Sequence, residues 1–143
     1  MNADVYEVWA PRMLAVLRIM VALLFIEHGT QKLFGFPPPM GGEGPPLFSL
    51  LGLAAVLEFV GGLLILVGLF TRPVAFLLAG EMAFAYFLAH APKSFFPALN
   101  GGDAAILFCF VFLYFSVAGA GAWSVDAARA PRPDRPASVR QAA

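Results

Sequence analysis

Four long apolar stretches, separated by segments rich in proline and glycine, constrain this 143-residue chain more than any other feature. They cover about residues 11–34, 47–70, 73–91 and 104–121. A helix that crosses the hydrocarbon core of a bilayer needs roughly 20 mainly apolar residues at about 1.5 Å each, and the last two stretches only just reach this length. The sequence therefore predicts an all-α fold, a four-helix transmembrane bundle.

The amino-acid composition supports the same conclusion. Hydrophobic residues make up 60 % of the chain and charged residues 13 %, against roughly 25 % charged residues in an average soluble domain. This excludes an ordinary cytosolic domain, a disordered chain and a nucleic-acid binder, and makes the lipid bilayer the main expected partner. The single cysteine, Cys109, allows neither an intrachain disulfide nor a cysteine metal cluster.

The breaker-rich segments suggest where the domain ends. Pro73 suits the first turn of a helix, and Asp103 stands where an N-cap would begin the last span. We expect residues 1–127 to form one membrane domain and residues 128–143 to form a disordered, Pro- and Arg-rich cytoplasmic tail. The first apolar stretch is longer than the apolar core of a signal peptide, so we expect it to be retained.

The distribution of basic residues predicts the orientation in the membrane. Four spans bring the chain back to its starting side, so both tails and the turn at Thr71–Pro73 share one side. Six arginines lie on that side: Arg12, Arg72, Arg129, Arg132, Arg135 and Arg140. Only Lys32 and Lys93 lie on the other. The positive-inside rule therefore predicts a multi-pass protein of the inner (plasma) membrane with both termini in the cytoplasm.

Ionisable side chains also occur deep inside the apolar stretches: Arg18, Glu27, His28, Glu58 and Glu81. Each costs about 2.5–3.5 kcal/mol at the centre of a bilayer on insertion scales. Because this cost disfavours contact with lipid, we expect these groups to face one another inside the bundle. His90 and Lys32 lie near span ends, where snorkelling can place their polar groups in water.

Helical geometry, at about 100° per residue, indicates which faces pack. In the first span, one half of the helix carries the polar side chains Arg18, Glu27, His28, Gln31 and Lys32. In the second, small residues surround Glu58 and predict a packed face: Ala54, Ala55, Gly61 and Gly62. In the third span, Glu81 lies nearly opposite a stripe formed by Ala75, Ala79 and Ala83. We expect one of these two faces, the Glu81 face or the alanine face, to pack within the bundle and the other to pack against a second subunit.

Similar depths predict two contacts between these residues. We expect Arg18 to pair with Glu81 or Glu58, and His28 to approach Glu58 from the outer side. Arg18 and Glu58 can then form a structural ion pair, or Arg18 can hold an oxygen atom of a ligand while Glu58 handles protons. Glu27 and Glu81 are favoured as structural or oligomer contacts.

Several short motifs occur in the order typical of one family. They are Leu17-Arg18, Phe25-x-x-His28-Gly29-x-x-Lys32-Leu33-Phe34, Glu58-x-x-Gly61-Gly62, Gly68-Leu69-Phe70-Thr71-Arg72, Asn100-Gly101-Gly102-Asp103 and Trp123-Ser124-x-Asp126. Together they resemble the DoxX family of small four-span membrane proteins over about residues 12–127. The resemblance implies a four-helix membrane bundle that is an oxidoreductase or a subunit of one, linked to quinone-coupled sulfur oxidation or redox-stress complexes. Glu27 and Glu81 depart from the family pattern, in which apolar residues are commoner, and make this site more acidic.

These observations lead to a first functional hypothesis, a protein of a quinone-linked membrane redox system. A quinone would enter from the membrane, with Glu58 and His28 handling protons. Five further residues are candidates for ligand binding: Arg18, Glu27, Gln31, Lys32 and Glu81. No motif for an intrinsic redox cofactor is present, so electrons would come from the ligand or from partner subunits.

Other functions fit the same residues. The bundle could bind or transport a small solute, or act as a non-catalytic scaffold, and a homo-oligomer is compatible with either. Metal binding is disfavoured because no helix carries two ligands at a suitable spacing, and a bis-histidine haem would have to join His28 to His90. The Phe-rich last span could line a quinone slot, although packing is the commoner role of such side chains: Phe108, Phe110, Phe112 and Phe115.

Overall fold

The computed structural model describes residues 3–38 and 44–131, and within these ranges the regular structure is entirely helical. The elements are α1 (Ala3–Phe34), α2 (Leu50–Val56), η1 (Leu57–Gly61), α3 (Gly62–Val67), α4 (Thr71–Ala85), η2 (Tyr86–His90), α5 (Pro97–Asn100), α6 (Asp103–Ala118) and α7 (Val125–Arg129). The predicted all-α fold class is confirmed. Most of the predicted tail, residues 132–143, lies outside the described residues.

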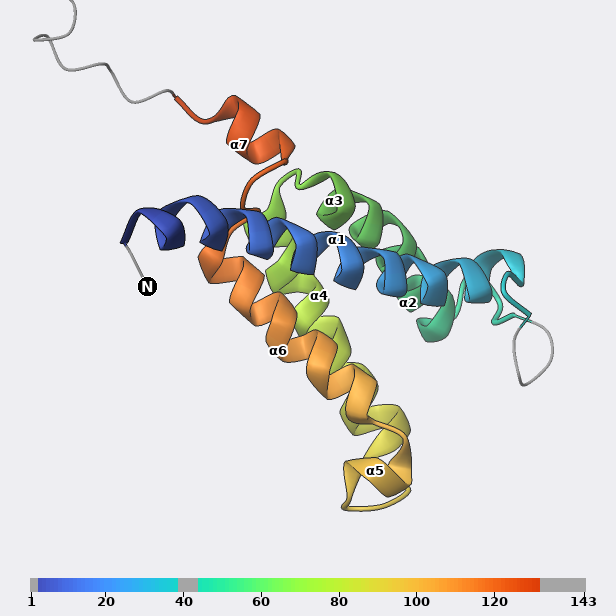
Figure 1. The fold of residues 1–143 in the computed structure, drawn as a ribbon. Helices are drawn as coiled ribbons and strands as arrows, with labels where there is room; N and C mark the ends of the chain where they lie inside the picture. Colours follow the sequence, from blue (N-terminus) through green and yellow to red (C-terminus); the bar gives the residue numbers. More distant parts are fainter. Residues whose placement is uncertain (1–2, 39–43, 132–143) are drawn as a thin grey trace, which may run out of the picture.

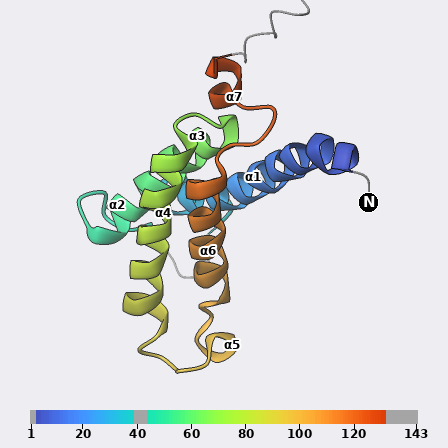
Figure 2. The same ribbon diagram turned by 90° about the vertical axis from the view of Figure 1, so that its left-hand side faces the viewer.

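The helices form two antiparallel hairpins that cross each other. One hairpin consists of α1 and the second span, which runs through α2, η1 and α3; the other consists of α4, η2 and α6. Figures 1 and 2 show the two hairpins meeting near the short α3–α4 turn and diverging toward the opposite ends of the molecule. The two hairpins therefore cross at an angle, unlike the spans of a bundle whose helices all run side by side.

Glycine residues allow the first hairpin to pack closely. A Cβ atom added to Gly29 would lie 2.6 Å from the backbone nitrogen of Phe59, and one added to Gly62 would lie 2.7 Å from the Ile26 side chain. Small residues are used at helix contacts in bilayers because they let backbones approach. The predicted packed face of the second span is thus confirmed: Ala55, Glu58, Gly61 and Gly62 are buried.

The core between the hairpins is aromatic. Phe25, Phe112 and Phe115 are fully buried, and the rings of Phe25 and Phe112 meet edge to face with centroids 4.8 Å apart. Phe110, in contrast, points outward. The aromatic residues of α6 therefore divide between core packing and the outer surface. On α4, Ala75 and Ala79 face the core as well, so this stripe packs inside the bundle.

Helix lengths agree with a membrane location for three of the four spans. Within the described residues, the stretches Val5–Phe34, Leu50–Val67 and Thr71–His90 are long and apolar enough to cross a bilayer, whereas α6 has only 16 residues. The first helix begins well before the predicted start at Pro11, which lies inside it. Asp103 is the first residue of α6 rather than its cap, which is Gly102.

Candidate functional site

An ion pair joins the two helices of the first hairpin. The Nζ atom of Lys32 lies 2.5 Å from Oε1 of Glu58, which is buried within the second span. Lys32 belongs to the last turn of α1, and its long, flexible side chain reaches the carboxylate on the second span. The second oxygen of Glu58, Oε2, is also buried and has no hydrogen-bond partner among the described residues.

Glu81 of α4 faces this pair. Gly61, about one turn beyond Glu58, packs so closely on Leu78 that an added Cβ would lie 2.8 Å from its Cδ2 atom. The antiparallel register of the two spans then places Glu58 opposite Glu81, and Glu58 and Lys32 are the charged groups that act on Glu81. Both carboxylate oxygens of Glu81 are buried without a hydrogen-bond partner in the described chain. We call Lys32, Glu58 and Glu81 the carboxylate cluster.

The backbone around Glu58 is irregular. Residues Leu57–Gly61 form a π-helical turn between two α-helical segments, and Glu58 is its second residue. Single π-turns inside α-helices are rare and occur frequently at functional sites. No feature of the sequence indicates this turn, because its composition is that of an ordinary apolar helix.

Three other predicted site residues of α1, namely Glu27, His28 and Gln31, make no hydrogen bond to the carboxylate cluster among the described residues. His28 is exposed, and its Nδ1–H donates to the Leu24 carbonyl oxygen at 2.8 Å, so the predicted approach of His28 to Glu58 is wrong. Its ring instead meets Phe108 at a centroid distance of 5.8 Å. Glu27 is also exposed, so the expectation that it faces the inside of the bundle is wrong. The Gln31 amide donates to the Pro38 carbonyl oxygen at 3.4 Å.

Arg18 binds backbone carbonyl groups rather than a carboxylate. Its guanidinium donates to the carbonyl oxygens of Ala120 at 2.8 Å, Ile65 at 2.6 Å and Trp123 at 2.9 Å, and also to that of Leu66. The predicted pair between Arg18 and Glu58 or Glu81 is therefore wrong. The carbonyl groups at the end of a helix lack partners within that helix, and Arg18 supplies the partners for the end of α3.

Asp126 makes a second structural contact at the same end of the molecule, with the start of α4. Its carboxylate accepts hydrogen bonds from the backbone N–H groups of Phe70 and Thr71, both at 2.9 Å, and thereby caps α4. Partial burial raises the pKa of the Asp126 carboxyl, but these hydrogen bonds and the nearby Arg129 outweigh burial and leave that pKa below its usual value. The motif residues around Asp126 thus serve to lock the chain's last described segment onto the α3–α4 turn.

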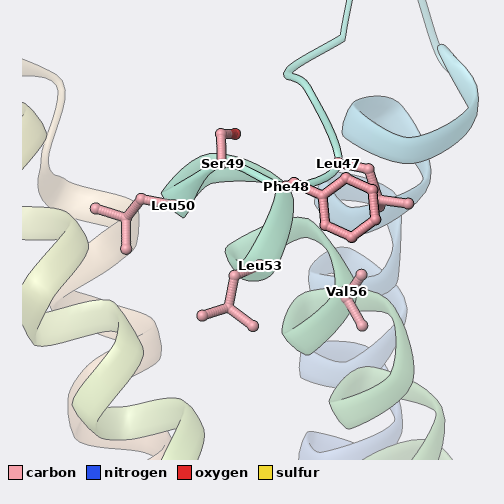
Figure 3. Close-up of a pocket in the computed structure, with 6 residues that line it drawn as sticks. All are labelled: Leu47, Phe48, Ser49, Leu50, Leu53 and Val56. Carbon is pink, nitrogen blue, oxygen red and sulfur yellow. The ribbon is translucent and has the colours of Figure 1, made fainter.

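Two open pockets lie away from the carboxylate cluster. The larger, of about 560 Å³, surrounds the start of α2 and is shown in Figure 3; its lining consists of Leu47, Phe48, Ser49, Leu50, Leu53 and Val56. It contains no ionisable side chain, and its apolar walls suit lipid contact. The other, of about 480 Å³, lies beside Thr71, Arg72 and Asp126 at the opposite end of the second span.

The fold and the site together define a helical membrane protein with a buried charged cluster. A family model, DoxX, matches residues 13–91, which is more than half of the chain. The chain belongs to the DoxX family, as its motifs predicted. No solved structure matches it significantly.

Similar proteins occur in several bacteria. An uncharacterized protein of Haemophilus influenzae is 48 % identical over 124 residues, covering 84 % of this chain and 92 % of the relative. The inner membrane protein YqjF of Escherichia coli is 35 % identical, covering 78 % and 87 % of the two chains. The uncharacterized membrane protein Rv3486 of Mycobacterium tuberculosis is 31 % identical, covering 81 % and 80 %. The similarity to these relatives identifies this chain as a membrane protein.

Proposed function

We propose that this protein is a component of a quinone-linked redox system of the inner membrane, and that its carboxylate cluster exchanges protons with the quinone. One observation carries the proposal: Glu58 and Glu81 present three buried carboxylate oxygens without hydrogen-bond partners among the described residues. Buried polar atoms nearly always have partners. Acceptors left open in this way are suited to bind protons or the donor groups of a ligand.

The charges of the cluster favour proton exchange. The cluster contains two carboxyl groups and a single ammonium group, so with both carboxyl groups ionised it would carry one negative charge that Lys32 does not balance. A proton held by Glu58 Oε2 or by Glu81 neutralises this charge without a second cation. Buried carboxylates in membrane segments are commonly parts of proton relays because an unbalanced charge is expensive there.

The side chains nearby suit a quinone. The Lys32 ammonium and a protonated carboxyl group of the cluster are donors for the carbonyl oxygens of a quinone. A bound quinone supplies two-electron chemistry, with the electrons delivered by or passed to a partner protein. This chain contributes the binding residues and the protons.

The test compares quinone binding by the full chain in lipid nanodiscs, with decylubiquinone as the probe. We expect Glu58→Gln and Glu81→Gln each to weaken binding tenfold or more and to abolish the pH dependence of affinity. Glu7→Gln, at an exposed position of α1, is the matched control and should bind like the wild type. If the wild type binds no quinone, or if both cluster variants bind it equally well at equal abundance, the proposal is refuted.

The orientation belongs to the same proposal. With both termini in the cytoplasm, Arg18 and Asp126 lie on the cytoplasmic side and the Lys32 end of α1 lies on the outer side. The excess of arginine near the termini and at the α3–α4 turn supports this arrangement. A test of this arrangement uses two variants in a Cys109→Ser background, Arg129→Cys and Lys93→Cys, each with a single cysteine. Each variant is treated with a membrane-impermeant maleimide. Labelling of the Arg129 position in intact cells would contradict it.

A further inference from the structure

The segment between η2 and α6 exposes an unusual amount of apolar surface for a loop. Phe95 is 86 % exposed, Leu99 75 % and Phe96 61 %. These side chains lie outside the four spans, where a loop facing water would normally carry polar residues. In Figure 1 the segment, which includes α5, forms the end of the α4–α6 hairpin that lies farthest from the α3–α4 turn.

The backbone of this loop is fixed by internal hydrogen bonds. The buried side chain of Asn100 donates to the Ser94 carbonyl oxygen at 2.8 Å and accepts from the Gly102 N–H at 2.7 Å. The ring of His90 donates through Nδ1–H to the Asn100 carbonyl oxygen at 3.0 Å. The exposed aromatic side chains are therefore presented by an ordered loop, and they do not fold back onto the core.

The length of α6 explains why apolar side chains are needed at this place. Its 16 residues span about 24 Å, whereas the hydrocarbon core of a bilayer is about 30 Å thick. Its partner in the hairpin, the stretch Thr71–His90, has 20 residues and reaches about 30 Å. The hairpin therefore lacks apolar length on the α6 side, at the end where α5 lies.

We propose that the loop from Ser94 to Asn100 inserts into the lipid leaflet on the side away from the chain termini and completes the short fourth span. Its internal hydrogen bonds pair part of the loop backbone and so lower the cost of such a position, since backbone groups in lipid cannot bond to water. Its apolar surface continues the exposed side chains Phe87 and Leu88 of η2. The occupant of the surface is lipid.

A tryptophan placed in the loop tests the proposal. In a Trp9→Phe/Trp123→Phe background, Phe95→Trp and Phe96→Trp each introduce a single reporter, and Leu88→Trp provides a lipid-facing reference on η2. The proteins are reconstituted in phosphatidylcholine vesicles, with or without lipids brominated at shallow or deep positions of the acyl chain. Circular dichroism and size-exclusion profiles show which variants retain the fold.

We expect both loop reporters to emit at short wavelength, to resist iodide, and to be quenched more by shallow than by deep bromine atoms. Emission at the wavelength of tryptophan in water, with quenching by iodide, would overturn the proposal. Shielding that occurs in native membranes but not in pure lipid vesicles would also overturn it, and would assign the surface to a protein partner. Neither result depends on quinone binding by the carboxylate cluster.

Discussion

Replacing Arg18 with methionine is the sharpest test of how this fold is held together. The side chain is 0 % exposed and makes four hydrogen bonds to carbonyl groups at the end of α3 and in the segment after α6. Methionine has similar length but no donor, so Arg18→Met removes all four of these hydrogen bonds, and among the described residues only the Ile65 carbonyl keeps another partner, the Gly68 N–H at 3.1 Å. The segment around Trp123 then loses the two hydrogen bonds that Arg18 makes to it and keeps the bond from Ala122 N–H to the Pro11 carbonyl oxygen.

The expected cost follows from these contacts. A hydrogen bond involving a charged group contributes at least about 1.5 kcal/mol, so losing four costs about 6 kcal/mol. Removing a buried charge from the membrane interior returns about 3 kcal/mol. The free energy of unfolding should therefore fall by about 3 kcal/mol, measured by denaturant unfolding in mild detergent.

Two controls separate this structural role from a role in ligand binding. Arg18→Lys keeps the charge but has a single nitrogen donor group, which cannot reach all four carbonyl groups, so its stability should also fall. The reasoning is refuted if Arg18→Met unfolds within about 1 kcal/mol of the wild type. A variant that stays stable but loses quinone binding would instead place Arg18 among the ligand-binding residues.

Three further predictions follow from other contacts. Lys32→Met should lower the free energy of unfolding by about 3 kcal/mol because it leaves Glu58 charged and unpaired, and the double variant Lys32→Met/Glu58→Gln should regain much of that loss in the same unfolding assay. The pKa of Asp126 is lower in the folded protein than in the unfolded chain, so ionised Asp126 stabilises the fold. This stabilisation is complete above the unfolded pKa of about 3.9 and is lost as the pH falls through the folded pKa. The free energy of unfolding of Asp126→Asn should therefore depend less on pH in that acid range than that of the wild type. Gly29→Ala should disrupt packing of α1 because its Cβ meets the facing backbone at 2.6 Å, whereas Gly80→Ala, with no atom within 4 Å, should unfold at or above the wild-type temperature.

The sequence predicted some of the features that depend on one helix alone, although Glu27 and His28 of the predicted polar face of the first span are exposed. Hydropathy located the four apolar stretches, and the small residues around Glu58 identified the face of the second span that packs. Both properties follow from residue spacing along a single helix. The motif from Asn100 to Asp103 was recognised as a pattern, but its role in fixing a loop required the structure.

The predicted contacts between helices were less accurate for a physical reason. A helical wheel gives the direction of a side chain but not the rotation or depth of the neighbouring helix, so Arg18 was assigned to a carboxylate at a similar estimated depth. The alternative partners, carbonyl groups at helix ends, have no signature in the side-chain sequence. Lys32 was expected to extend to water, but its flexible chain reaches equally well toward Glu58.

The facing carboxylates, however, could have been found from the sequence by using the turn as the origin. Residues at equal distances from the midpoint of a tight antiparallel turn lie at the same depth. Glu58 lies 11 residues before Leu69 and Glu81 lies 11 residues after Phe70. When depth is counted instead from the estimated ends of each apolar stretch, the depths of Glu58 and Glu81 differ by about 6 Å. The ends of a stretch can be located only to within several residues, and each residue adds about 1.5 Å to the error. Turn-centred counting thus places Glu58 and Glu81 at one depth on neighbouring helices, and two neighbouring carboxylates in a bilayer require a cation, a proton or a ligand to offset their charge.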